Sequence, residues 1–183
     1  RKAFRRPSSI RVQYLPSIEN IKQRIMRYIP NVEKDPRAWI PSFRGYASIA
    51  GKHIVTFDKV HYDLDGNCNY VLSRDYKGGK WAVVLNQATK NRHITVVAYN
   101  KKFNIYNDHS VTVDGRKVEL PFVYRGLSIL RFGPIIKAKD TVLGFSVKSD
   151  VVNDIHTVGV IGWYHGKLGG LFGNFDNEPY NDM

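Results

Sequence analysis

The chain has 183 residues, of which 43% are hydrophobic and 24% charged, with 28 Lys or Arg against 16 Asp or Glu. This length and composition suit one globular domain with an extension, large enough to bury a core without disulfide bonds. The sequence lacks an uninterrupted apolar run of eighteen residues, which excludes a membrane-spanning helix, and a single cysteine, Cys68, excludes an internal disulfide bond.

The positive charge is concentrated near the start of the chain. Residues 1–50 contain 11 Lys or Arg and 3 Asp or Glu, whereas the remaining residues contain 17 and 13. Nucleic-acid-binding domains combine a basic surface with a recognition helix, a zinc-finger spacing or an aromatic RNA-binding motif. The sequence has none of these, so we expect no nucleic-acid partner. The opening "RKAFRRPSS" has neither Met nor a signal peptide, which indicates a fragment of a longer precursor.

The first periodic stretch predicts an amphipathic helix over about residues 17–29. Pro16 and Ser17 suit its start and Pro30 its end. Its apolar face either packs on a neighbouring part of the protein or lies on an anionic lipid surface. Residues 31–51 show no periodicity and predict an extended linker. We therefore expect a basic N-terminal segment over residues 1–45.

From residue 51 onward the pattern predicts strands and no further helix. Short runs rich in β-branched and aromatic residues recur about every ten residues, with turn signals between them. Asp114-Gly115 between alternating apolar residues predicts a tight hairpin. These features indicate an all-β, antiparallel domain, either a sandwich or barrel-like.

Catalytic motifs are missing from the sequence. The six histidines form no H-E-x-x-H pattern or zinc-binding set, and the glycine-rich stretches lack the Gly-Lys-Ser/Thr ending of a phosphate-binding loop. No G-x-S-x-G motif occurs either. We expect a protein that is not an enzyme.

Two stretches about a hundred residues apart carry a specific resemblance. "HIVTFDKVHYDLDGNCNYVL" (residues 53–72) and "GLFGNFDNEPYND" (residues 170–182) together resemble the opening and closing motifs of the von Willebrand factor type D family. The family pattern is His-x-x-Thr-Phe-Asp, then Gly-x-Cys-x-Tyr-Val-Leu, and finally Gly-x-x-Gly-Asn with an acidic loop. The resemblance implies a domain of this type over residues 46–183.

The resemblance also implies a calcium site. The implied ligands are the side chains of Asp58, Asn174, Asp176, Asn181 and Asp182, with a backbone carbonyl near Glu178. The chemistry agrees, because calcium takes six to eight oxygen ligands from carboxylates, amides and carbonyls. Such an ion would be structural and would join the last loop to an early strand. The alternative is a loop that backbone turns order without metal.

Two departures from the family pattern concern its cysteines. Phe172 occupies the position of a family cysteine whose partner falls on Tyr46. We expect an apolar contact between Tyr46 and Phe172 in place of the disulfide. Cys68 matches a cysteine whose family partner lies outside the domain. Cys68 is therefore either free or paired outside this chain. As a free cysteine it would most simply be a small buried hydrophobic residue.

A cysteine-poor domain of this kind resembles those of large lipid-transfer proteins, the apolipophorins, vitellogenins and clottable lipoproteins, with the apolipophorin branch most similar. This implies a calcium-stabilised, non-catalytic module of a secreted, extracellular lipoprotein, whose partners are the rest of a large precursor and the lipids of the parent particle. The alternative is an adhesion or receptor-binding module that grips polyanions or lipid head groups through a basic cluster comprising Arg1, Lys2, Arg5, Arg6 and Arg11.

Overall fold

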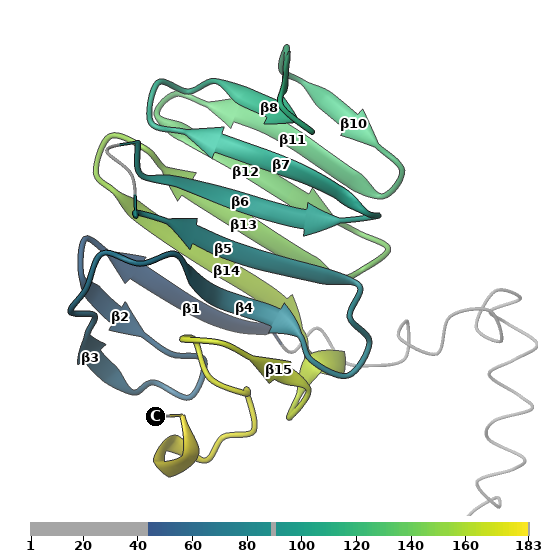
Figure 1. Cartoon of the computed structure of the whole chain (residues 1–183). Helices are drawn as coiled ribbons and strands as arrows, with labels where there is room; N and C mark the ends of the chain where they lie inside the picture. Colours follow the sequence, from purple (N-terminus) through teal and green to yellow (C-terminus); the bar gives the residue numbers. More distant parts are fainter. Residues whose placement is uncertain (1–43, 89–90, 183) are drawn as a thin grey trace, which may run out of the picture. The chain divides into compact units, whose positions relative to one another are not determined.

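A computed structural model describes residues 44–88 and 91–182 of the chain (Figure 1). Regular structure in this part is almost entirely strand, so the predicted all-β class is confirmed. The strands are β1 (Arg44–Ala50), β2 (His53–Val55), β3 (His61–Asp63), β4 (Tyr70–Asp75), β5 (Trp81–Asn86), β6 (His93–Ala98), β7 (Lys101–Tyr106), β8 (Val111–Val113), β9 (Arg116–Val118), β10 (Phe122–Tyr124), β11 (Leu127–Phe132), β12 (Ile135–Asp140), β13 (Phe145–Asp150), β14 (Ile155–Ile161) and β15 (Leu168–Gly169). Two short 3-10 turns, η2 (Gly162–Tyr164) and η3 (Pro179–Asn181), complete it.

The predicted helix over residues 17–29 and most of the linker lie outside the described residues. So do the basic residues of the predicted polyanion or lipid surface, which are Arg1, Lys2, Arg5, Arg6 and Arg11. The helix and the basic surface therefore stay predictions.

The strands form two antiparallel sheets that lie face to face (Figure 1). The eight-stranded sheet has the order β10-β11-β12-β13-β14-β1-β2-β3, and the seven-stranded sheet has the order β15-β4-β5-β6-β7-β8-β9. Neither sheet closes on itself, so the sandwich is the architecture found. Antiparallel neighbours joined by short turns account for most of the strand order.

The core lies between the two sheets and follows from the alternation of side chains along each strand. In β5, Trp81, Val83 and Leu85 are buried, while the residues between them are partly exposed. The ring of Trp81 stacks on Phe145 of the opposite sheet at a centroid distance of 4.6 Å. Aromatic stacking adds to the free energy that area burial provides. The inner faces therefore hold the two sheets together largely through apolar contact.

The predicted hairpin at Asp114-Gly115 is confirmed. β8 and β9 pair across these two residues, which have φ values of 49° and 84°. Positive φ at both central positions matches the tight turn whose twist suits antiparallel strands. The Asp114 carboxylate also accepts a hydrogen bond from the backbone N–H of Lys102 at 2.9 Å, which ties the hairpin to β7.

Part of the predicted linker is wrong, because residues 44–50 form β1 in the middle of the eight-stranded sheet. β1 pairs with β14 on one side and β2 on the other, and buries Ala47 and Ile49. The sequence "RGYASIA" contains small residues that carry little strand signal. Tertiary pairing overrides that weak local preference.

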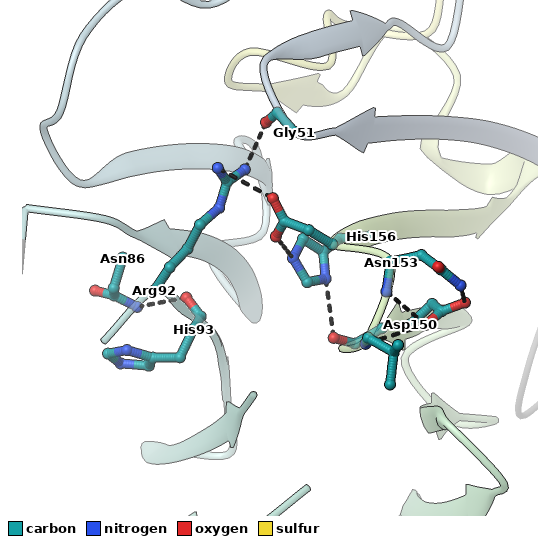
Figure 2. Close-up of polar contacts among 10 residues, drawn as sticks. Gly51, Asn86, Arg92, His93, Asp150, Asn153 and His156 are labelled. Atoms are coloured by element: carbon teal, nitrogen blue, oxygen red, sulfur yellow. Dashed lines mark hydrogen bonds and ion pairs between the residues drawn. The ribbon is translucent and has the colours of Figure 1, made fainter. Parts of the chain in front are cut away.

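A polar bridge joins the two sheets at one end of the sandwich (Figure 2). The Arg92 guanidinium, just before β6, donates to the Gly51 carbonyl at 2.6 Å and lies 3.2 Å from the Asp154 carboxylate. Gly51 follows β1 and Asp154 precedes β14, so both belong to the eight-stranded sheet. The Arg92 side chain is only 25% exposed, which reduces solvent screening of the ion pair.

Candidate metal centre

The C-terminal turn is fastened between β2 and β4 by backbone hydrogen bonds. The N–H groups of Leu171 and Phe172 donate to the carbonyls of Val71 and Leu72 at 3.0 and 2.9 Å. On the other side, the Phe57 N–H donates to the Phe172 carbonyl at 3.0 Å. The residue after Phe57 is Asp58, so this arrangement brings that carboxylate to the start of the acidic loop.

Glycine is required at two positions of this turn. Gly170 has φ of 127°, and a Cβ there would lie 2.7 Å from the Val71 carbonyl oxygen. Gly173 has φ of 81°, and a Cβ there would overlap the Asp182 carboxylate. Only glycine combines this backbone conformation with so close an approach. The two glycines therefore set the path of the loop and the place of its last carboxylate.

Three aromatic side chains form an apolar floor beneath the acidic loop. Phe57, Phe172 and Phe175 are at most 4% exposed. Phe57 meets Phe172 edge-on at a centroid distance of 6.2 Å and Phe175 at 5.5 Å. This floor shields one side of the loop from water, so charges above it are less well solvated.

Asp58 accepts the two backbone N–H groups at the turn of the acidic loop. Its carboxylate oxygens lie 3.2 Å from the Asp176 nitrogen and 2.9 Å from the Asn177 nitrogen. The turn is sharp because Phe175 and Asn177 have φ values of 61° and 67°. A positive φ is strained for a bulky residue such as Phe175. The strain at Phe175 aims both N–H groups at one carboxylate that is only 8% exposed.

Asp176 is the centre of a second group of hydrogen bonds. Its carboxylate accepts from the side-chain amides of Asn181 and Asn174 at 2.9 and 2.8 Å, and from the Glu178 N–H at 2.8 Å. The bond from Asn181 is the main cause that lowers the pKa of Asp176 below its ordinary value. Hydrogen bonds to the charged form favour it, so Asp176 is held as a carboxylate.

Asp182 differs from Asp176 because it is buried and incompletely hydrogen-bonded. One of its oxygens accepts from the Asn174 N–H at 3.2 Å, whereas Oδ2 is buried without a hydrogen-bond partner among the described residues. Burial is the main cause that raises the pKa of Asp182, and the negative charges of Asp58 and Asp176 add to it. A hydrogen bond from Thr56 and the one from Asn174 act in the opposite direction.

These residues have the chemistry of a calcium site. The set offers carboxylate and amide oxygens, and the bare Asp182 Oδ2 is an unsatisfied acceptor on a carboxyl group whose pKa the negative charges of Asp58 and Asp176 help to raise. A divalent cation would supply the missing partner and offset the repulsion. In the described residues no three His, Cys, Asp or Glu side chains converge as a metal-binding group. The Asn174 and Asn181 amides point N–H groups at Asp176, so a half-turn of each amide would present oxygen instead.

The structure places every predicted ligand near this turn, but the parts played by Glu178 and Asn177 are distinct. The Glu178 side chain is exposed, its N–H binds Asp176, and its carbonyl accepts the Asn181 N–H at 3.4 Å. Asn177, which is outside the predicted ligand set, donates its N–H to Asp58, and its side-chain amide lies 3.1 Å from His165 Nε2.

Two further residues support the site from β2 and β3. Thr56, directly after β2, is fully buried, accepts the Val60 N–H at 3.1 Å and acts to lower the pKa of Asp182. The Tyr62 hydroxyl donates to the Leu171 carbonyl at 2.6 Å. Both belong to the matching motif in the sequence. That match alone singled them out, without indicating which partners their hydroxyl groups would find.

The predicted contact between Tyr46 and Phe172 does not fit the alternation of β1. Tyr46 is 44% exposed and lies over Gly159 on the outer face of the sheet, whereas Phe172 is fully buried. Neighbouring Gly45 faces inward, where a Cβ would lie 2.7 Å from the Phe175 ring. Phe172 finds its aromatic partner in Phe57 instead. Cys68 is exposed and free, which corrects its interpretation as a buried residue.

A Ser-His-Asp arrangement beside the polar bridge invites comparison with hydrolases. Ser149 Oγ lies 2.9 Å from His156 Nδ1, and His156 Nε2 lies 3.1 Å from the Asp154 carboxylate (Figure 2 labels His156). Ser149 is fully buried and His156 is 1% exposed, so a substrate cannot reach the hydroxyl group. A nucleophile must meet its substrate, and this chain of hydrogen bonds extends the inter-sheet bridge instead.

Comparison with known proteins agrees with the motifs and the fold. Residues 47–183 match the von Willebrand factor type D domain family. The chain is 29% identical to the apolipophorins of Locusta migratoria over 79% of its length and 27% identical to those of Drosophila melanogaster over 92%. It is also 28% identical to SCO-spondin of Mus musculus over 76% of its length.

The chain spans only 4%, 5% and 3% of the length of these three relatives. Among the described residues, no helix has the length and apolar character needed to cross a membrane. The family match begins within β1 and extends through the acidic loop. The chain therefore belongs to the von Willebrand factor type D domain family.

Proposed function

We propose that this domain is a non-catalytic module, stabilised by one structural calcium ion, within a secreted lipid-transport lipoprotein of the apolipophorin kind. Asp58, Asp176 and Asp182 would supply the negative charge that holds the ion. Asn174 and Asn181 would add amide oxygens, and a backbone carbonyl near Glu178 would complete the set. The ion would supply counter-charge rather than reactivity.

The observation that carries the calcium proposal is the buried, unpartnered Oδ2 of Asp182. A buried carboxylate oxygen without a partner is costly, and its pKa is raised in consequence. Asp58 and Asp176 add negative charge at the same place. A cation at this point would both bind the unsatisfied oxygen and offset the repulsion between the carboxylates. The turns and amide hydrogen bonds of the loop do neither.

The lipoprotein context rests on the relatives. Apolipophorins of two insects align with most of this chain at 27–29% identity. SCO-spondin carries the same kind of domain, so the domain type alone does not fix the context. The cysteine-poor sequence favours the lipoprotein branch, because one exposed cysteine cannot build disulfide-linked polymers. The parent would act outside the cell and carry lipid, with this domain as one of its parts.

Thermal unfolding with and without a chelator tests the calcium role. We expect the melting temperature to fall in EGTA and to recover with calcium, less well with magnesium, because ligands that bind only the folded state stabilise it. Magnesium prefers a smaller octahedral shell and retains its water. Identical melting in EGTA and in calcium would refute the proposal.

The substitution Asp176→Ala, compared with Glu178→Ala, tests the assignment of ligands. In calcium, Asp176→Ala should markedly lower the free energy of unfolding, since it removes a ligand and three hydrogen bonds. Glu178→Ala should change it by less than about 0.5 kcal/mol, because its exposed side chain has no partner role in the proposed site. Urea unfolding of both variants measures the difference, and equal small effects would contradict the assignment.

A further inference from the structure

The outer face of the eight-stranded sheet carries lysines at neighbouring positions. Lys137 of β12 is directly opposite Lys148 of β13, and Lys139 is two residues along β12 on the same face. Across the sheet, Ser146 is opposite Lys139, Leu130 is opposite Lys137 and Thr157 is opposite Lys148. The three lysines therefore lie close together on this face.

No carboxylate in the described residues pairs with these lysines. The ion pairs there involve other cations, namely Lys52, His53, Arg92, Lys101 and His156. Asp150 shares the face, but it accepts hydrogen bonds from the N–H groups of Val152 and Asn153 and from the Asn153 amide. Like charges directly opposite on paired strands are destabilising. Among the described residues, the fold thus holds three neighbouring lysines on this face without an ion pair.

Apolar side chains border this cluster along the next row of the sheet. Phe132, Ile135 and Ile155 occupy paired positions of β11, β12 and β14, with Asp150 between the last two. Phe132 is 57% exposed and Ile155 40%, and Val152 in the adjoining turn is 67% exposed. Exposed apolar groups next to a charged patch mark a contact surface.

We propose that this face, formed by β11–β14, docks on an anionic phospholipid surface. The lysines would meet the head-group phosphates, while Phe132 and its neighbours would enter the interface beside them. A shallow groove of about 160 Å³ lies next to Lys139, with Arg44, Tyr46 and Asp140 among the residues that line it. The inference goes beyond the calcium-stabilised role and rests on different residues, so either can fail without the other.

The combination of positive charge and exposed apolar side chains favours a lipid surface as the partner of this face. A soluble polyanion would use the lysines but gain nothing from Phe132 and Ile155. The chain's own N-terminal residues are a poor occupant, because residues 1–50 contain 11 Lys or Arg against 3 Asp or Glu. A lipid surface has both the negative charge and the apolar layer that the face presents.

Co-sedimentation of the full 183-residue chain with vesicles tests the proposal. The probes are phosphatidylcholine vesicles with and without phosphatidylserine, in EGTA and in calcium. We expect binding to the anionic vesicles only, weakened by added salt. The triple variant Lys137→Gln, Lys139→Gln, Lys148→Gln should lose at least about tenfold in the partition coefficient. Phe132→Ser should lose roughly fivefold.

The matched control removes three exposed lysines elsewhere, two between β4 and β5 and one in β7, in the variant Lys77→Gln, Lys80→Gln, Lys102→Gln. It carries the same net charge and should retain most of the vesicle binding. Equal losses in the two triple variants, or no loss in either, would overturn the proposal. So would vesicle binding that Phe132→Ser leaves unchanged while dextran sulfate binds through the same lysines, since that pattern identifies a soluble polyanion as the partner. Thermal melting verifies that each variant is folded.

Discussion

At the scale of single residues, the three carboxylates of the candidate metal centre differ in how the fold treats them. Asp58 and Asp176 are satisfied by N–H groups of the loop itself, whereas Asp182 keeps a bare buried oxygen. Hydrogen bonds stabilise a carboxylate, and burial without them destabilises it. Asp182 is therefore the residue at which metal-bound and metal-free protein should differ most.

The substitution Asp182→Asn should raise the melting temperature in EGTA and lower it in calcium. In EGTA it removes a destabilising buried charge, so the variant should unfold at a higher temperature than the parent protein. In calcium it removes a ligand, so the variant should unfold at a lower temperature. Thermal unfolding in both buffers measures this, and a variant that is less stable by the same amount in each would contradict it.

Because the pKa of Asp182 is raised, the difference in stability between Asp182→Asn and the parent protein in EGTA should depend on pH. An acid whose pKa is raised by folding destabilises the protein above the folded pKa, and this cost vanishes as the pH falls below the ordinary value of 3.8. The advantage of Asp182→Asn in EGTA should therefore be full at pH 7 and shrink towards pH 3.5. Asp176 has a lowered pKa and contributes stability that is lost only as the pH falls through its folded pKa, below 3.8. Urea unfolding of both proteins across this range isolates the Asp182 contribution.

Gly173 offers a test of how closely the loop approaches itself. Gly173→Ala adds a methyl group that overlaps the Asp182 carboxylate, whereas Gly115→Ala meets no atom within 4 Å at nearly the same φ. Both variants carry the backbone strain, so their difference isolates the overlap. We expect Gly173→Ala to cost about 1–3 kcal/mol more than Gly115→Ala in urea unfolding. Equal costs would mean that the loop moves aside freely.

At the scale of elements, the sequence predicted the strands whose pattern was strong and missed those that depend on neighbours. The Asp114-Gly115 hairpin carries its turn chemistry in two residues and was predicted correctly. β1 was missed because small residues and flanking prolines hide a strand that forms between β14 and β2. Pairing partners distant in sequence decide such strands.

The outward lysines of β12 allow a stability prediction that is independent of any lipid. Lys137→Gln removes the repulsion from Lys148 directly opposite, so it should raise the free energy of unfolding by about 0.2–1 kcal/mol at low salt. Lys80→Gln, at an exposed turn, is the control and should leave it nearly unchanged. Urea unfolding at low and high salt makes the measurement, because salt should erase the gain. A loss of stability in Lys137→Gln would show that the two charges are neutralised.

At the scale of the whole molecule, the candidate metal centre joins distant parts of the chain. The hydrogen bonds from residues 176 and 177 to Asp58 span 118 and 119 positions, so they close nearly the full length of the sandwich. Ordering so long a loop costs conformational entropy. A cation at the junction would offset that cost where the C-terminal turn meets the end of β2.

The sequence indicated which residues gather at the candidate site, but not their geometry. Motif matches selected Asp58, Asn174, Asp176, Asn181 and Asp182 as expected ligands, and the structure brings these residues together at one turn. The expected contact with Phe172 required Tyr46 to face inward from β1, but the residue that faces inward there is Gly45. A shift of one residue reverses the face of a strand, and counting from a motif cannot settle that register.

Calcium titration calorimetry of the 183-residue chain tests the central claim most directly, namely that an ion links Asp58 to the acidic loop. We predict one calcium ion bound per chain, with binding abolished in Asp58→Asn and retained in Asp65→Asn, whose side chain is 90% exposed. A chain that binds no calcium, or that binds it equally well as Asp58→Asn, would contradict the account.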